Sequence, residues 1–370
     1  MKVRKGVLKA RRAILLAGSV FAALPLCGAM AADQAVIYPL PPDLGWYYYG
    51  GFEAGARFYM QKPPSGFGRA APPDNWLTPK NTDSIAKFEE YGKIPQAPLL
   101  DWINLQTGSN DGRYAFDFWG RSVGLNNQSY SLDAAAIGYH YLSLGWEQTP
   151  HLISTSAKNI FGGVGTTRLT VPDSIQAALQ AQMANAAANS PAGVAARAAI
   201  ENIINSNLNP LELSTRRDTS TVGYKYTPND DWTFQVDYSH EHRTGVRPLG
   251  VSWGFNGGFA SNAIEAPAPI NDTTQNVNAG GEYFGTTFFG TKWNTNVRYV
   301  GSFYDNHNTS FTVENPFCVS TCFPTLLQMP MQPDNQANGV VWNTGVDLPW
   351  VKSRYVSTFQ YNHMTQNDPT

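Results

Sequence analysis

The sequence predicts an all-β protein, a large antiparallel transmembrane β-barrel of the outer-membrane type that is incomplete in this chain. Three observations predict this fold class. Segments in which apolar and polar residues alternate recur along the chain, as in strands with one face toward lipid and the other toward a lumen. Short turns and long connections alternate between those segments. The chain also begins with a signal for export.

Residues 1–31 have the parts of a secretory signal peptide. Six basic residues precede an apolar run over 13–26, and Ala29-Met30-Ala31 supplies small residues at the cleavage positions. The alternative is an uncleaved membrane anchor, but the run is shorter than the roughly 20 residues that a membrane helix needs. We therefore expect a mature chain that starts at Ala32, with 32–44 as a proline-rich periplasmic lead. No later stretch is apolar enough for a membrane helix.

Composition bears on the partners and on the cysteines. The signal peptide holds six of the 26 basic residues and none of the 28 acidic ones, which leaves the mature chain with a net charge of −8. That charge argues against nucleic acid as a partner and permits contact with a basic protein. Cys318 and Cys322 lie close together in an exported chain, which predicts a local disulfide. The alternative is a metal pair, but it has no nearby histidines.

The alternation is clearest in residues 46–60. One face carries large apolar residues such as Trp46 and Phe52, while both charges, Glu53 and Arg57, fall on the other face. The segment exceeds the roughly 9–11 residues that a tilted strand needs to cross a bilayer. Aromatic residues cluster at both of its ends, which is typical of the girdles of outer-membrane barrels. Residues 61–111 are then expected to form a long irregular connection.

The next segments repeat the pattern before a helical insert interrupts it. Residues 113–121 alternate, with Asp117 and Arg121 on the polar face, and 129–147 are expected to form one long strand. The connection over 148–215 contains Asp173-Ser174-Ile175-Gln176, which resembles a capping box, and Ser190-Pro191, which could open a second helix. The sequence therefore predicts a small helical insert near 172–206.

The second half returns to strands. A hairpin with a turn near 229 joins 222–226 to 232–239, and Asp237 lies on its polar face. After a long connection over 243–275, residues 276–284 and 292–303 alternate, the latter with Lys292 and Arg298 on the polar face. Residues 306–339 form another long connection, which holds the cysteine pair. Residues 340–347 and 351–361 are the last two expected strands.

The lengths of the connections predict an orientation. Short turns near 126, 229, 285 and 348 alternate with the long connections, and outer-membrane barrels place short turns in the periplasm and long loops outside. The polar faces would then line the lumen, with the following candidates: Glu53, Arg57, Asp117, Arg121, Asp237, Lys292 and Arg298. Nine strands would leave an unpaired edge, which lipid does not tolerate, so 45–370 is expected to be the front part of a larger barrel.

Four stretches of the sequence point to a family. They are Arg217-Asp218-Thr219, the run Pro-Ala-Pro-Ile-Asn-Asp-Thr-Thr from Pro267, Glu314-Asn315-Pro316-Phe317, and Gln366-Asn367-Asp368-Pro369. In this order they resemble the MtrB/PioB family of decahaem-associated outer-membrane proteins, and the resemblance covers Gly45 to the end of the chain. It is closer to the PioB-like branch of iron-oxidising phototrophs, because the amino-terminal Cys-x-x-Cys of some metal-reducing members is absent.

The resemblance implies a function. The barrel would sheathe a periplasmic decahaem c-type cytochrome, similar to MtrA or PioA, so that electrons cross the outer membrane of a Gram-negative bacterium. This chain has no Cys-x-x-Cys-His motif, so the haem would be carried by the partner and no cofactor is expected here. A general diffusion porin or solute transporter is the alternative.

The absence of a recognisable catalytic arrangement in the sequence favours a protein that is not an enzyme. No Ser-His-Asp or paired-carboxylate arrangement stands out, so no catalytic residue is expected. His240 and His242 share one face of a strand and could hold a metal. However, that face continues the aromatic face of the preceding residues, which favours a place in an interfacial girdle, and no metal site is predicted.

Overall fold

The computed structural model describes residues 45–58, 84–93, 97–186, 189–252, 263–287, 289–319 and 324–367. The expected signal peptide and periplasmic lead lie outside these residues. No helix in the described part of the chain is both long and apolar enough to cross a bilayer.

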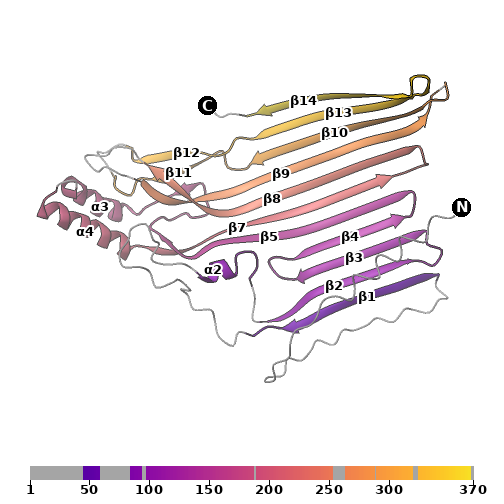
Figure 1. Cartoon of the computed structure of the whole chain (residues 1–370). Helices are drawn as coiled ribbons and strands as arrows, with labels where there is room; N and C mark the ends of the chain where they lie inside the picture. The colour runs from indigo at the N-terminus through magenta and orange to yellow at the C-terminus, as the bar shows by residue number, and fades with distance from the viewer. Residues whose placement is uncertain are drawn as a thin grey trace. The chain divides into compact units, whose positions relative to one another are not determined.

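One antiparallel sheet of 11 strands dominates the described structure, and its strands lie side by side in chain order (Figure 1). The sheet is open, with β1 and β14 at its two edges. This confirms the predicted fold class, although with two more strands than the sequence suggested. The strands are β1 (Trp46–Ala56), β2 (Pro98–Ser109), β3 (Tyr114–Val123), β4 (Ser129–Ala136), β5 (His140–Asn159), β7 (Asn209–Tyr226), β8 (Trp232–Ser252), β9 (Ala263–Thr286), β10 (Lys292–Asn306), β13 (Asn335–Leu348) and β14 (Ser353–Gln366).

The two ends of the sheet differ in how they are connected. At one end, which we call the turn end, adjacent strands are joined through 110–113, 137–139, 227–231, 287–291 and 349–352. The last of these contains a 3₁₀ turn, η2 (Pro349–Val351). At the other end, the loop end, the connections are 57–97, 124–128, 160–208, 253–262 and 307–334. Apart from 124–128, the short connections gather at the turn end, as expected of an outer-membrane barrel.

Two errors in the predicted strand boundaries compensate for each other, because one strand was missed and one hairpin was predicted as a single strand. The connection predicted over 61–111 contains β2, and the single strand predicted over 129–147 is the β4–β5 hairpin, which turns at 137–139. The turn near 126 exists, but it lies at the loop end and not with the other short turns. Because Ala136 pairs directly with His140, even-numbered residues stay on one face through the hairpin, so the predicted faces survived the error.

The other long connections are shorter than predicted. β5 continues to Asn159 and β7 begins at Asn209, so only 160–208 of the predicted 148–215 connects them. The β8–β9 hairpin fills most of 243–275, and β13 begins inside the predicted 306–339. These extensions were missed because Gly and Pro residues interrupt the alternation there, while the backbone ladder continues.

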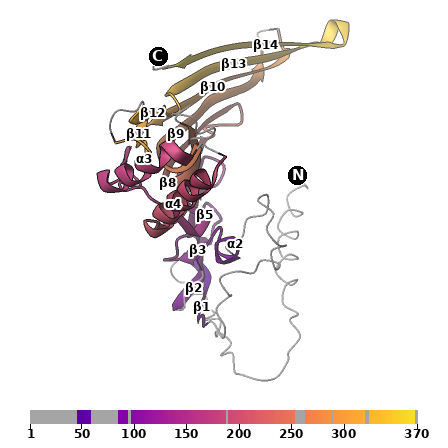
Figure 2. The same ribbon diagram turned by 90° about the vertical axis from the view of Figure 1, so that its left-hand side faces the viewer.

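A small globular unit forms at the loop end, and Figure 2 shows its helices and strands grouped there. It consists of α3 (Asp173–Ala186), α4 (Pro191–Ser206) and a three-stranded sheet of β12 (Leu326–Pro330), β11 (Ser310–Glu314) and β6 (Arg168–Leu169). We call this unit the cap. Its helices confirm the predicted insert near 172–206.

The two helices of the cap start in different ways. Ser190 is the N-cap of α4, and Pro191 follows it at the first helical position, as predicted. The Ser190 hydroxyl accepts a 3.2 Å hydrogen bond from the backbone amide of Gly193. The capping box at α3 is not formed as predicted. Gln176 is buried and donates instead to the carbonyl of Asn315 at 2.8 Å, which ties α3 to the segment after β11.

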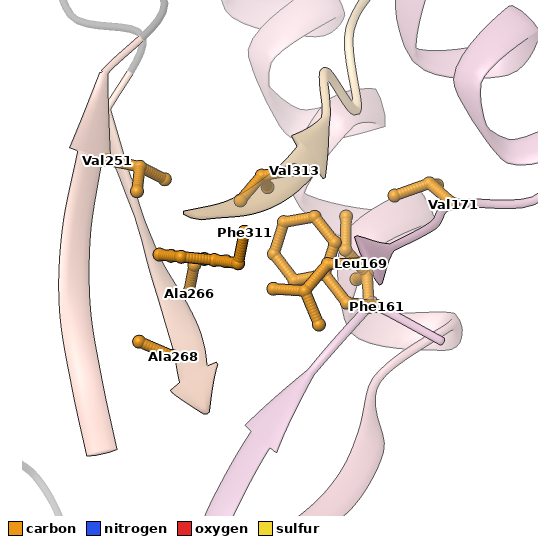
Figure 3. Packing of buried hydrophobic residues seen from close by; sticks show 9 residues of the cluster. Phe161, Leu169, Val171, Val251, Ala266, Ala268, Phe311 and Val313 are labelled. Carbon is orange, nitrogen blue, oxygen red and sulfur yellow. The ribbon is translucent and has the colours of Figure 1, made fainter. Parts of the chain in front are cut away.

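The core of the cap joins three distant parts of the chain. Phe311 and Val313 of β11, which are fully buried, pack with Phe161 and Leu169 on one side and with the β8–β9 extension on the other (Figure 3). The β8–β9 extension is the part of these two strands beyond the His240–Gln275 pair, and it contributes Val251, Ala266 and Ala268. The cap is therefore held by hydrophobic burial to the part of the sheet beyond the predicted membrane strands.

A short helix, α2 (Ser84–Phe88), is followed by residues that contact β5. Glu90 accepts a hydrogen bond from Lys87 and lies 3.3 Å from the His151 imidazole, while the Glu90 carbonyl accepts a 2.8 Å bond from the Leu152 amide. The Tyr91 and His151 rings stack with centroids 5.3 Å apart. These contacts tie the segment after α2 to the loop end of the sheet.

We expect this attachment to weaken in acid. The hydrogen bond from Lys87 is the main cause that lowers the pKa of Glu90 below its ordinary value of 4.5, and His151 lowers it further. Because the folded-state pKa is lower than the unfolded one, the carboxylate contributes stability above pH 4.5 and loses it as the pH falls through the folded-state pKa. Hydrogen exchange should show that the protection factor of the Leu152 amide falls in that range.

A matched amide separates this local event from general unfolding. The Thr227 amide donates to the Tyr139 carbonyl at the turn end and has no contact with Glu90, so its protection should persist. Glu90→Gln should reduce the protection of Leu152 already at neutral pH. Parallel loss at both amides would contradict the local assignment.

Candidate functional site: the two faces of the sheet

The strand register assigns every residue of the sheet to one of two faces, because residues directly opposite each other point to the same side. One row across β4, β5, β7, β8 and β9 is apolar: Leu132, Leu144, Val222, Tyr238 and Val277. The adjacent row is polar: Asp133, Ser143, Gly223, Asp237 and Asn278. We call the two sides of the sheet the apolar face and the polar face.

The apolar face is bounded by two belts of aromatic residues. On five strands that run from the turn end to the loop end, a ring at the start of the strand is followed six residues later by a second ring on the same face. The pairs are Trp46 and Phe52, His140 and Trp146, Trp232 and Tyr238, Trp293 and Tyr299, and Tyr355 and Tyr361. Rings within the turn-end belt pack together: the ring centroids of Trp232 and Tyr283 are 4.6 Å apart, and those of Tyr283 and Trp293 are 5.2 Å apart.

From β5 to β10, both belts shift by the same number of residues toward the turn end of the sheet. Phe234 is in the register row of Tyr226 and His140, yet the turn-end ring of β8 is Trp232, two residues further toward the turns. On β10 that row holds Val297, and the ring is Trp293, four residues further. Such a shift is expected when strands tilt relative to a planar membrane, as they do in barrels. The spacing was present in the sequence but was not used to find the belts.

The apolar band has the height of a membrane. On β8 it runs over nine residues from Trp232 to His240, where the face becomes polar. A tilted strand needs about 9–11 residues to cross the hydrocarbon core. Beyond His240 both faces carry polar contacts, such as His242 with Asn271 at 3.0 Å on the apolar face and Arg243 with Asp272 at 2.8 Å on the polar face. The loop end of the sheet is therefore suited to water.

The register brings together six of the seven predicted lumen residues. They all lie on the polar face: Glu53, Asp117, Arg121, Asp237, Lys292 and Arg298. Arg57 does not join them, because a register shift between Glu53 and Ala54 breaks the alternation and β1 ends at Ala56. Its guanidinium lies 3.8 Å from Asp101 instead. That the polar face lines a lumen stays a prediction.

A comparison with known proteins identifies the chain. A family model described as a putative outer-membrane β-barrel porin, MtrB/PioB, matches residues 80–370. The chain belongs to the MtrB/PioB family. It is accordingly an outer-membrane β-barrel protein of porin-like type, in agreement with the apolar band and its belts. Which branch of the family it represents stays a prediction.

Two further similarities concern individual proteins. The outer-membrane protein MtrB of Shewanella baltica (strain OS185) is 25% identical over 219 residues, which are 59% of this chain and 27% of that protein. The match thus spans about a quarter of the length of this relative. The solved structure of a loop L8 deletion mutant of OmpT, an outer-membrane protein of Vibrio cholerae, covers 87% of this chain and 74% of its own at 11% identity. Its TM-score of 0.29 is too low to establish a shared fold.

The polar face of this MtrB/PioB protein is lined mostly by short side chains. Within the band its rows contain many Gly, Ser, Thr and Asn residues, among them Gly145, Gly223, Gly280 and Gly345. At Gly280 the strands leave no space for more, since an added Cβ would lie 2.7 Å from the Val297 carbonyl oxygen. Most carboxylates on this face have partners: Asp117 accepts from Asn104 and Gln106 at 3.0 and 2.9 Å.

The remaining candidates lie outside the band. Cys318 is buried in the cap and disulfide-bonded. Its predicted partner Cys322 lies outside the described residues, so the pairing stays a prediction. His240 and His242 lie on the apolar face at and beyond the loop-end limit of the band, and their place in an interfacial girdle stays a prediction. Within the described ranges, no group of three or more His, Cys, Asp or Glu residues is placed to hold a metal ion.

Proposed function

We propose that this protein is the outer-membrane sleeve of a periplasmic multihaem c-type cytochrome, and that it enables electron transfer across the outer membrane for oxidation or reduction of extracellular iron or other metals. The observation that carries the proposal is that the polar face, opposite the apolar band, is lined mostly by short side chains. Rows of Gly, Ser, Thr and Asn allow a guest protein to approach the backbone closely, and scattered charges provide polar contacts to it. The guest would carry the haem.

The physical requirements of such a conduit match a barrel. A chain of haems needs a sleeve that excludes lipid and keeps bulk water out, and a closed barrel satisfies every backbone hydrogen bond in the membrane. The open edges of β1 and β14 must be paired in lipid, either with each other or with further strands. Barrels of 16–18 strands already hold an aqueous channel, so a larger barrel has room for a slender protein.

A general diffusion porin or solute transporter is the second candidate, and the description of the matching family favours it. The two candidates differ in what fills the lumen. A sleeve is blocked by its guest and conducts few ions, whereas a porin stays open to solutes.

One purification distinguishes them. The protein is extracted from outer membranes in mild detergent, captured by an affinity tag and tested for co-purified c-type haem by in-gel haem staining. The same sample is inserted into planar bilayers to measure ion conductance. We expect a haem-staining partner in stable proportion and low conductance. Recovery of the barrel alone with large, steady conductance would overturn the sleeve and support the porin.

A further inference from the structure

We propose that one patch on the polar face anchors the guest protein and that this patch binds a basic protein surface. The patch, called here the tryptophan patch, consists of Trp102, Trp119, Arg121, Asp133 and Glu147 on strands β2 to β5. The proposal rests on the proposed sleeve function and specifies where the guest is held.

The two tryptophans are on the unexpected side of the sheet. Five of the tryptophans in described strands lie on the apolar face: Trp46, Trp146, Trp232, Trp293 and Trp342. The other two tryptophans in the described strands, Trp102 and Trp119, lie on the polar face, with ring centroids 6.1 Å apart. Trp102 is opposite Glu53, beside the belt ring Phe52, and Trp119 is in the register row of Gly145, beside the belt ring Trp146, so both are level with the loop-end belt but on the other face of the sheet.

Trp119 is exposed on the polar face, while Trp102 is half-buried and its indole N–H donates a 2.7 Å hydrogen bond to Glu53. The Trp119 side chain is 37% exposed, and the Arg121 guanidinium lies 5.9 Å from the centre of its ring. Leaving a large aromatic surface in water costs about 25 cal/mol for each Å² that a partner could bury. Tryptophan and arginine are also the residues most enriched at the energetic centres of protein interfaces. A docked protein accounts for these side chains, whereas a water-filled pore does not.

The patch also contains a recess. Trp119, Arg121 and Glu147 contribute the long polar-face side chains around a space of about 400 Å³. Its floor is made of short side chains: Ser129, Ser131, Gly145, Thr219 and Thr221. An added Cβ at Gly145 would lie 2.4 Å from the Thr221 hydroxyl oxygen, so a larger residue at position 145 would have to displace the Thr221 side chain. The recess therefore has room for protruding side chains of a guest.

The charges indicate what kind of guest surface fits. Four carboxylates occupy the polar face of β1 to β5 against the single guanidinium of Arg121: Glu53, Asp117, Asp133 and Glu147. Asp133 lies directly opposite Asp117, and like charges in that position repel. Amides compensate Asp117, but Asp133 is exposed and has no hydrogen-bond or ion-pair partner among the described residues. A lysine or arginine of the guest would relieve this repulsion.

Site-specific photo-crosslinking tests the location. The photoreactive residue p-benzoylphenylalanine is placed at position 119, or at position 102 as a second site, in the protein as produced by its bacterium. Control sites are Trp342 on the apolar face and Trp350 in the β13–β14 turn. We expect haem-staining adducts from 119 and 102 and none from 342 or 350. Haem-staining adducts from 350 but not from 119 or 102 would overturn the proposal.

Substitutions test the chemistry. Trp119→Ala and Asp133→Lys should each lower the amount of co-purified haem protein by about tenfold or more, because a few central residues carry most of the binding energy of an interface. Asp230→Lys makes the same charge change in the β7–β8 turn and should retain the guest. Heat-dependent mobility in gels confirms that each variant is folded.

The outcomes separate two failures. If the unaltered protein retains no haem protein, the sleeve function itself is wrong. If it retains the guest, and the folded variants at 119 and 133 retain as much, only the assignment of the tryptophan patch is wrong.

Discussion

Replacing Val236 by arginine is expected to destabilise the membrane-inserted protein by about 2–4 kcal/mol, the cost of a cation on the lipid side of a barrel near the bilayer midplane. Val236 lies on the apolar face of β8, between the belt residues Trp232 and Tyr238, and its side chain is 46% exposed. In lipid that exposed surface would meet acyl chains. The free energy of unfolding is measured by reversible unfolding in denaturant of protein inserted into lipid vesicles. The folded fraction at each denaturant concentration is determined from the heat-dependent mobility of the protein in gels.

The neighbouring residue provides the control. Gln235 is adjacent in sequence, lies on the polar face and donates a 2.8 Å hydrogen bond to Asp237. Gln235→Arg adds the same charge on the other side of the strand, so we expect it to change the free energy of unfolding by about 1 kcal/mol or less. An equal loss at both positions, or a larger loss at Gln235, would show that the two faces have been assigned wrongly.

The faces could be predicted from sequence because period-two alternation is a direct consequence of strand geometry. Each time the sequence placed Leu132, Tyr238 or Val297 on one side and Asp117, Asp237 or Arg298 on the other, the register agreed. Strand ends were harder to predict, because the strands continue beyond the apolar band and Gly and Pro residues interrupt the alternation there. The i to i+6 aromatic pairs would have marked the membrane limits.

The missed strand has a specific cause. In β2 the polar face carries Trp102 between Leu100 and Asn104, so the apolar and polar residues do not separate cleanly. Trp119 interrupts the polar face of β3 in the same way. Departures from a local pattern concentrate at functional sites. The two residues that blur the strand signal are the ones that we assign to the guest.

The cap could be predicted only in part. Helix signals at Ser190 and Pro191 are local, and they predicted α4 correctly. The core around Phe311 is not local, since it joins Leu169, Val251 and Ala266 across large separations in sequence. No pattern within residues 306–339 specifies which distant segments pack on it. The same non-local origin suggests that the cap can come loose without unfolding the membrane strands.

Replacing Phe311 by alanine tests this independence. The side chain is fully buried, and truncating a buried phenylalanine typically costs about 3–5 kcal/mol. Because Val251, Ala266 and Ala268 are its neighbours on the β8–β9 extension, the loss falls on the junction between cap and sheet. We expect proteases added to intact vesicles to cut 160–208 and 307–334 much faster, while the strands of the apolar band stay protected.

Two comparisons decide how that result is interpreted. Phe58→Ala removes the same atoms from a side chain that is 79% exposed after β1, so we expect an effect below about 0.5 kcal/mol and an unchanged digestion pattern. If Phe311→Ala also releases the membrane strands to protease, the cap and the barrel unfold as one unit. If instead the cap stays protected, the burial of Phe311 does not hold the cap to the sheet. Loss of the cap alone would show that the apolar band and its belts suffice to keep the strands in the membrane.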